Sequence, residues 1–346
     1  MIDRLAPAQH DTIDDVPEPA ENAVLVGHDE VRAALAASYK AGQLHHALML
    51  AGPEGIGKAT LAFHLAWHLL RYPDPATAPD MVGNPDPASP LFRAIAQGAH
   101  PSVLHLTRPA NDRTKGFKTA VTVDEIRKVG RFLGMSAHDG GYRIVIVDPA
   151  DDMNTNAANA LLKNLEEPPR KTIFVLVAHM PGRLLPTIRS RCRMIRLSPL
   201  DAPQLGKALK LLGVEVADED VLHQAGGSVR KALLQGLYGG AEIAAAVHDG
   251  IAARRFDFAH VSRLADAVTQ RDQPLQYQIF NEHLLGQLAE RAHEAAGQGQ
   301  SARAAQLATL WSETRRAMQE AEAYNLDKRQ QVMMLMMAAH EALHAA

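Results

Sequence analysis

The sequence predicts an α/β protein in which a parallel-sheet domain is followed by helical regions. Short, uninterrupted apolar runs, of which residues 143–148 are the clearest, alternate with segments of helical periodicity. Such runs are typical of strands that are buried on both faces of a parallel sheet. Beyond Pro199 the pattern becomes entirely helical. These observations favour a three-layer α/β domain with a separate helical part.

The individual elements follow from periodicity and from the residues that interrupt it. Strands are expected at residues 47–51, 102–106, 143–148, 172–177 and 194–197. Helices are expected at residues 30–42, 58–72 and 91–97, from Thr122, and from Asn154 to the residue before Pro168. In the last helix, an apolar stripe of Val332, Leu335, Met336, Ala339 and Leu343 follows Asp327, a candidate helix cap.

Four segments are expected along the chain. Residues 1–21, rich in Asp, Pro and Ala, are predicted to be a flexible lead-in. Residues 22–198 form the α/β domain, in which the proline-rich residues 73–90 are an irregular insertion. Residues 199–243 contain short helices, and residues 244–346 contain longer ones.

Composition limits the classes of function. A chain of 346 residues is too long for one core, and its formal charge of −3 gives no general attraction to DNA, so any DNA contact needs a local patch. The single cysteine, Cys192, excludes a disulfide framework and a multi-cysteine zinc site. His45 and His46 are interpreted as structural rather than as metal ligands. No run is long enough to span a bilayer, so we expect a soluble, cytoplasmic protein without membrane contact.

A glycine-rich turn connects the first strand to the following helix and matches the phosphate-loop pattern G-x-x-x-x-G-K. Its backbone N–H groups, the helix N-terminus and a lysine are suited to bind the phosphates of ATP or ADP. The motif then requires Ser or Thr as a Mg²⁺ ligand, but Ala59 has no hydroxyl, and Thr60 lies about 100° further round the helix. Mg²⁺ binding is therefore expected to be weak. The residues expected at the phosphates are Gly52, Pro53, Glu54, Gly55, Ile56, Gly57, Lys58, Ala59 and Thr60.

Asp148 ends a buried strand, where nucleotide-binding sheets place their magnesium-holding acid. An active ATPase of this design has Glu at the next position, where this chain has Pro149, which cannot orient water. Asp151 and Asp152 are expected to act as caps or to be solvated. The loss of two groups weakens hydrolysis without preventing binding, so a degenerate nucleotide site is predicted.

Four further features, taken in order, resemble bacterial clamp-loader subunits, which are AAA+ proteins. They are Leu44-His45-His46-Ala47, the loop 52–58, the helix 157–163 continuing through Leu165-Glu166-Glu167-Pro168-Pro169, and Ser190-Arg191-Cys192. Asn325-Leu326-Asp327 extends the similarity toward the end of the chain. The chain most resembles the delta-prime subunits of DNA polymerase III. The gamma/tau motor subunits would be expected to keep the hydroxyl and the Glu.

The resemblance implies a RecA-like domain, a small helical lid and a C-terminal helical collar that packs in a ring. It implies that Arg191 is an arginine finger for the neighbouring subunit's ATP, and that Arg230 is a second sensor of the phosphates. Without the motif, Arg191 would be read as part of a basic surface with Arg183, Arg189, Arg193 and Arg196, and Arg230 as an ordinary helix-start residue. His179, after the apolar Ala178, is the candidate first sensor. The family's zinc module is expected to be absent, because residues 73–90 contain no cysteine.

The implied function is that of a stationary member of a hetero-oligomeric clamp loader, which places the sliding clamp on primed DNA. Its partners would be the gamma/tau and delta subunits and, through them, the clamp and DNA. It would belong to a DNA-directed DNA polymerase holoenzyme, with its own ATPase activity absent or very weak. Two alternatives stay open: an active ATPase motor like gamma/tau, and a scaffold that binds no nucleotide.

Overall fold

The computed structural model describes residues 4–111, 116–134, 141–214, 219–270, 274–324 and 326–344. The chain forms two compact units, Met1–Arg230 and Lys231–Ala346. The segment 199–243, expected to be one small helical domain, is therefore divided between them. Just before the division, the Val229 amide donates to the Gly55 carbonyl at 2.9 Å and ties the start of a helix to the phosphate loop.

The first unit is built on a parallel sheet of five strands in the order β2-β3-β4-β1-β5, which confirms the predicted α/β fold. The strands are β1 Ala47–Ala51, β2 Val103–Leu106, β3 Arg143–Val147, β4 Thr172–Ala178 and β5 Arg193–Arg196. The three central strands are apolar on both faces and almost completely buried. β5, at an edge of the sheet, begins and ends with exposed arginines.

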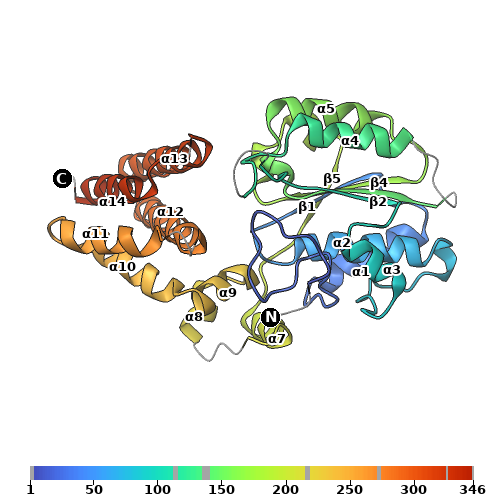
Figure 1. Ribbon diagram of the computed structural model, residues 1–346, viewed down its shortest axis with the longest axis horizontal. Coiled ribbons are helices and arrows are strands. Elements are labelled where there is room, and N and C mark those ends of the chain that lie inside the picture. Colours follow the sequence, from blue (N-terminus) through green and yellow to red (C-terminus); the bar gives the residue numbers. More distant parts are fainter. Residues whose placement is uncertain are drawn as a thin grey trace. The chain divides into compact units, whose positions relative to one another are not determined.

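Helices cover both faces of the sheet (Figure 1). On one face lie α1 (Asp29–Lys40), α2 (Lys58–Arg71) and α3 (Pro90–Ala96), and on the other lie α4 (Val123–Gly134) and α5 (Thr155–Glu166). Side chains of a strand alternate between the faces. In β1, Leu48 and Leu50 join the core under α1 and α2, whereas Met49 joins the core under α5.

Short elements complete this unit. The helices are α6 (Pro186–Arg189), α7 (Ala202–Leu211) and α8 (Glu219–Gln224), and the 3₁₀ turns are η1 (Pro75–Thr77), η2 (Ala150–Asp152) and η3 (Pro181–Arg183). Helix α9 (Val229–Leu237) begins at the end of this unit and continues into the second. The insertion 73–90 is irregular apart from η1 and the start of α3. It is nevertheless anchored, because Val82 is fully buried and its carbonyl accepts a hydrogen bond from Arg32 Nε at 2.8 Å.

The N-terminal segment is packed against the domain, so the prediction of a flexible lead-in is wrong for residues 4–21. Ala6, Ile13 and Ala20 are buried, although the segment contains no helix or strand. The Arg4 guanidinium contacts Glu18 at 3.1 Å, which fixes the turn of the segment. Contacts within the segment and apolar burial replace regular secondary structure here.

The second unit is helical and consists of α10 (Gly240–Ala252), α11 (Phe258–Val268), α12 (Pro274–Gly297), α13 (Ser301–Tyr324) and α14 (Lys328–His344). α10 and α14 pack closely: a Cβ atom added at Gly250 would lie 2.6 Å from Met336 Cε. The predicted stripe of α14 is confirmed for Val332, Leu335, Met336 and Ala339, which are buried, whereas Leu343 is half-buried.

The Asp327 cap is also confirmed, since its carboxylate accepts from the Gln330 amide at 2.8 Å. Asn325 lies outside the described residues. Among the helices that the structure describes, none combines the length and the apolar character that crossing a bilayer requires.

Candidate functional site

The predicted phosphate loop lies between the end of β1 and the start of α2. Two of its glycines are required by close packing: a Cβ at Gly52 would lie 2.5 Å from the Leu197 carbonyl oxygen, and one at Gly55 would lie 2.5 Å from Arg230 Cβ. Gly55 and Gly57 also have φ values of +75° and +97°, which residues with a side chain rarely adopt. The loop therefore packs against Leu197, directly after β5, on one side and against the start of α9 on the other.

The loop lysine points inward. Lys58 is 2% exposed, and its Nζ donates to the carbonyls of Gly52, at 2.8 Å, and of Pro53. Burial lowers the pKa of Lys58 to about 8, and Asp148 opposes that shift when it is ionised. The ammonium group that would bind phosphate is thus hydrogen-bonded to the loop's own backbone.

Asp148 follows β3 and faces the same region. It is buried, and burial raises its pKa to about 8, with a further contribution from Asp11 and an opposing one from Lys58. The carboxyl group is therefore mainly protonated at neutral pH. A neutral carboxyl is a poor Mg²⁺ ligand, so this site adds little to replace the hydroxyl that Ala59 lacks.

Asp151 has a structural role that the sequence did not indicate. It is 8% exposed, and the helix that follows is capped by Asn154, so the expectation that Asp151 would be a cap or solvated is wrong. Its carboxylate accepts from the backbone amides of His179, at 3.0 Å, and Met180, at 2.9 Å, and so positions the segment that follows β4. Asp152 forms an ion pair with Arg108 at 2.6 Å and is not solvated either.

This arrangement brings His179 to the site. Burial lowers the pKa of His179, and Lys58 lowers it further, so the imidazole is neutral at pH 7. Its Nδ1 atom is buried without a hydrogen-bond partner among the described residues. A neutral imidazole in this position can donate to or accept from a ligand.

Arg230, in the first turn of α9, lies against the loop. Its Nε atom is 3.2 Å from Glu54 Oε1, and its Nη1 atom donates to the carbonyl of Asp11. Only 11% of the Arg230 side chain is exposed. The guanidinium group therefore bridges the loop and the N-terminal segment.

Asp11 is the residue at this site that sequence reasoning missed. Burial alone would raise the pKa of Asp11, but His10 and Arg230 outweigh it and lower the pKa below its ordinary value. An ionised carboxylate therefore lies beside Arg230, where a bound phosphate would bring further negative charge. No sequence motif indicates Asp11. It lies at the site because residues 4–21 pack against the α/β domain.

Arg191 does not join this group. It precedes β5, its Nη2 atom is 2.5 Å from Glu166 Oε1, and its Nη1 atom donates to the Thr187 carbonyl at 2.9 Å. About a third of its side chain is exposed, as is half of that of Glu166. The chain thus gathers Lys58, Asp148 and Arg230 around its loop and holds Arg191 elsewhere at the surface.

Comparisons with known proteins identify the family. A family model described as "DNA polymerase III, delta subunit" matches residues 27–201. A DNA polymerase III subunit delta' from Pseudomonas aeruginosa is 34% identical over 261 residues, which cover 73% of this chain and 75% of that protein. The chain belongs to the delta-prime family of DNA polymerase III subunits.

The family also has more distant relatives. A DNA polymerase III subunit tau from Escherichia coli is 29% identical over 225 residues, covering 62% of this chain and 32% of that protein. A solved gamma subunit-related protein from Thermotoga maritima has 17% sequence identity and a TM-score of 0.39, and the match covers 90% of this chain and 100% of that structure.

One stability prediction follows from the packing of the loop. Gly55→Ala is expected to lower the free energy of unfolding, because its Cβ would overlap Ser228 Oγ at a φ of +75°. Gly42→Ala is the matched control, with a φ of +66° and nothing within 4 Å of the added atom. We expect about 1 kcal/mol of loss for the control and a further 1–3 kcal/mol, roughly, at Gly55. Urea unfolding of both variants measures the difference, and equal losses would contradict the close packing.

Proposed function

We propose that this chain is a clamp-loader subunit that does not drive ATP hydrolysis itself and supplies Arg191 to the ATP of a neighbouring subunit. The observation that carries the proposal is the position of Arg191. It lies at the surface, apart from the chain's own phosphate loop, and is held only by the partly exposed Glu166 and by the Thr187 carbonyl. Exposed ion pairs contribute little, so the guanidinium group can exchange Glu166 for a phosphate at small cost.

The chain's own loop is proposed to bind ATP or ADP weakly and without hydrolysis. Three features support this: Lys58 is engaged with loop carbonyls, Arg230 is engaged with Asp11, and Asp148 is mainly protonated. Each must change before a Mg²⁺-nucleotide complex can bind. Ala59 lacks the hydroxyl that would bind the metal, and Pro149 lacks the acid that would position the attacking water.

The proposed partners are the gamma/tau and delta subunits of the same hetero-oligomer and, through them, the sliding clamp and primed DNA. The chain would work in the cytoplasm, with its C-terminal helices, α10 to α14, as the oligomerisation collar. We also propose that it holds no zinc, because its single cysteine, Cys192, cannot build a cysteine zinc site within the chain.

The test is a nucleotide titration of the full chain combined with a phosphate-release assay. Weak, saturable ATP and ADP binding without Mg²⁺-dependent phosphate release is expected. Steady phosphate release by the chain alone would establish the motor alternative. Absence of any affinity for nucleotide would establish the scaffold alternative. Either of these two results would overturn this part of the proposal.

A second prediction concerns Asp11. Asp11→Asn removes a negative charge beside Arg230 but keeps the backbone carbonyl that accepts from it. The affinity for ATP is expected to rise about tenfold, because one repulsive interaction with the triphosphate is lost. The same titration measures it, with Asp15→Asn, an exposed position of the same segment, as the control. Equal affinities of the two variants would show that Asp11 does not face the phosphates.

A further inference from the structure

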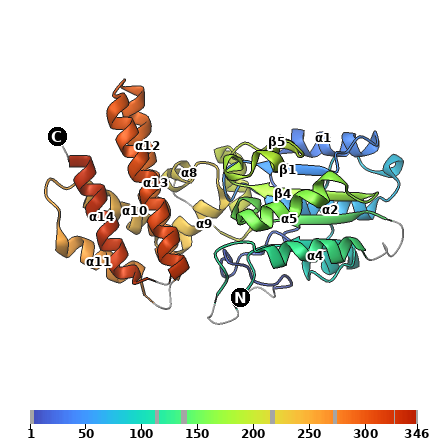
Figure 2. The same ribbon diagram turned by 90° about the horizontal axis from the view of Figure 1, so that it is seen from above.

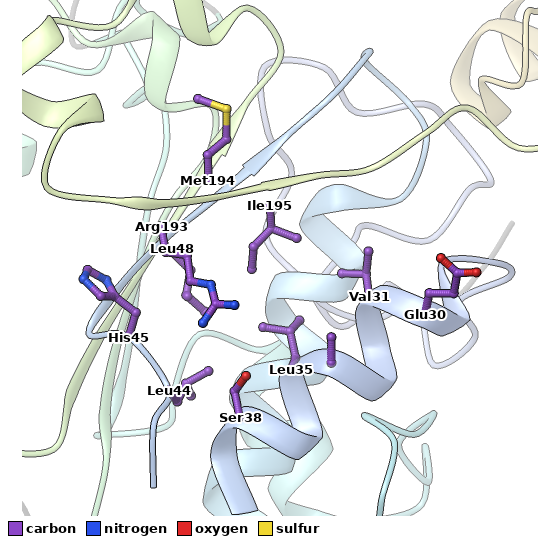
Figure 3. Close-up of a pocket in the computed structure, with 11 residues that line it drawn as sticks. Glu30, Val31, Leu35, Ser38, Leu44, His45, Leu48, Arg193, Met194 and Ile195 are labelled. Carbon is purple, nitrogen blue, oxygen red and sulfur yellow. The ribbon is translucent and has the colours of Figure 1, made fainter. Parts of the chain in front are cut away.

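The outer edge of β5 adjoins a cavity that belongs to neither the phosphate loop nor Arg191. β5 lies at the edge of the sheet beside α1 (Figure 2). Between them is a cavity of about 260 Å³ (Figure 3). Its lining is mostly apolar, with the α1 residues Val31, Ala34 and Leu35 facing Leu48 and Ile195.

The backbone of β5 has donors and acceptors available at this edge. The Leu197 amide donates to the Ala51 carbonyl at 2.8 Å, so Leu197 and, by alternation, Ile195 and Arg193 direct their backbone groups toward β1. Met194 and Arg196 therefore direct their N–H and C=O groups outward. In the part of the chain that the structure describes, no strand pairs with this edge.

The side chains of β5 define what could pair there. Arg193, Met194 and Ile195 all line the cavity, but the side chain of Met194 points away from those of Arg193 and Ile195 (Figure 3). Arg193 and Arg196 form no ion pair among the described residues. From the strand's first residue to its last, the edge thus presents a cation, two apolar side chains and a second cation.

We propose that the outer edge of β5 binds an extended segment of a partner protein with the pattern acidic-apolar-apolar-acidic. Residues that face one another in paired strands have their side chains on the same face of the sheet. An acidic residue opposite Arg193 and another opposite Arg196 would each meet an unpaired guanidinium group. The apolar residue opposite Ile195 would fill the cavity beside α1, in the manner of strand addition to a sheet edge.

Charge argues against a second copy of this chain as the occupant. If two β5 strands paired antiparallel through the outward-facing groups of Met194 and Arg196, each Arg196 would lie opposite Met194 of the other copy, and no carboxylate would meet Arg193 or Arg196. Arginines also occur on edge strands as protection against association. That role alone predicts no binding of any peptide, whereas an acidic segment would neutralise both charges.

The test uses the full chain and a fluorescein-labelled peptide, Thr-Glu-Val-Ile-Glu-Thr, followed by fluorescence anisotropy. Saturable binding is expected, and the peptide with both Glu replaced by Lys is expected to bind at least about tenfold more weakly. Arg193→Glu in the protein should cause a similar loss. N-methylation of the peptide's Val and Ile amides should abolish binding, because strand pairing needs those donors.

Two variants of α1 test the cavity without disturbing the core. Ala34 and Ala37 are both exposed on α1, but only Ala34 lines the cavity. Ala34→Phe is expected to weaken peptide binding about tenfold, and Ala37→Phe is expected to leave it unchanged. Absence of saturable binding, equal binding of the Lys peptide, or equal behaviour of the two variants would overturn the proposal. So would self-association through this edge, measured as a dimer mass in sedimentation that Arg193→Glu alters.

Discussion

If Arg191 acts as proposed, replacing it by Ala is expected to lower the DNA-stimulated ATPase rate of the neighbouring subunit's site by about 10³. An arginine finger supplied in trans stabilises the charge that develops on the transferred phosphoryl group, and alanine offers no donor. The folded chain should tolerate the change, because the ion pair of Arg191 with Glu166 is partly exposed and contributes little to stability. The measurement is phosphate release by the complex reconstituted from the full variant chain with gamma/tau and delta subunits.

Three further variants separate a finger from a general basic surface. Arg189→Ala removes an exposed arginine two positions earlier and should leave the rate unchanged. Glu166→Gln releases Arg191 from its partner and should preserve activity. Arg191→Lys keeps the charge but loses the planar fork, so most of the rate should be lost. An unchanged ATPase rate for Arg191→Ala in a fully assembled complex would contradict the proposal that Arg191 is an arginine finger.

The sheet could be predicted because each strand is indicated by the residues of its own short segment. β1, β3 and β4 are uninterrupted apolar runs, and only a strand buried on both faces requires such runs. β5 was expected one residue late, at 194–197, because an edge strand carries charged side chains and has a weaker pattern. The phosphate loop was predicted for the same local reason, since its glycines lie together in sequence.

The contacts that close the site could not be predicted, because they join distant parts of the chain. Arg230 donates to Asp11, which lies 219 positions earlier, and Asp151 accepts from amides 28 and 29 positions later. Neither contact leaves a periodic pattern. The contact between the start of α9 and Gly55 of the loop is of the same kind, since it joins residues far apart in the sequence. Composition suggested flexibility for residues 4–21, but a few long-range contacts suffice to order such a segment.

The stability of the first unit is expected to depend on two buried histidines of α2. His68 is fully buried, its ring contacts Tyr39 and Tyr72, and neither ring nitrogen has a hydrogen-bond partner among the described residues. His64 is 1% exposed, and its Nε2 atom lies 2.8 Å from the Asn22 carbonyl. Burial lowers the pKa of each to about 4.

The sign of the effect follows from proton binding. Below pH 6.5 the unfolded chain takes up protons on these histidines, whereas the folded chain does so only near pH 4, so stability is lost as the pH falls through this window. Asp148 contributes the opposite slope, because burial raises its pKa to about 8 and its stabilising proton is lost as the pH rises. Comparing variants with the wild type cancels the contribution of Asp148.

Between pH 7 and pH 5, the wild type is therefore expected to lose about 2 kcal/mol of unfolding free energy relative to His68→Phe. Relative to the double variant His64→Phe/His68→Phe, the expected loss is about 4 kcal/mol. Urea unfolding at the two pH values measures both differences.

Tyr39→Phe is the matched control for the aromatic cluster. It removes the hydroxyl that donates to the Tyr72 carbonyl at 2.6 Å, and tyrosine does not titrate between pH 5 and pH 7. Its effect on stability should therefore be the same at both pH values. If His68→Phe behaved in the same way, the imidazole of His68 would have to accept a proton in the folded state. That would require a water-accessible path to a ring that is 0% exposed, and the folded core around α2 would have to open for the proton to enter.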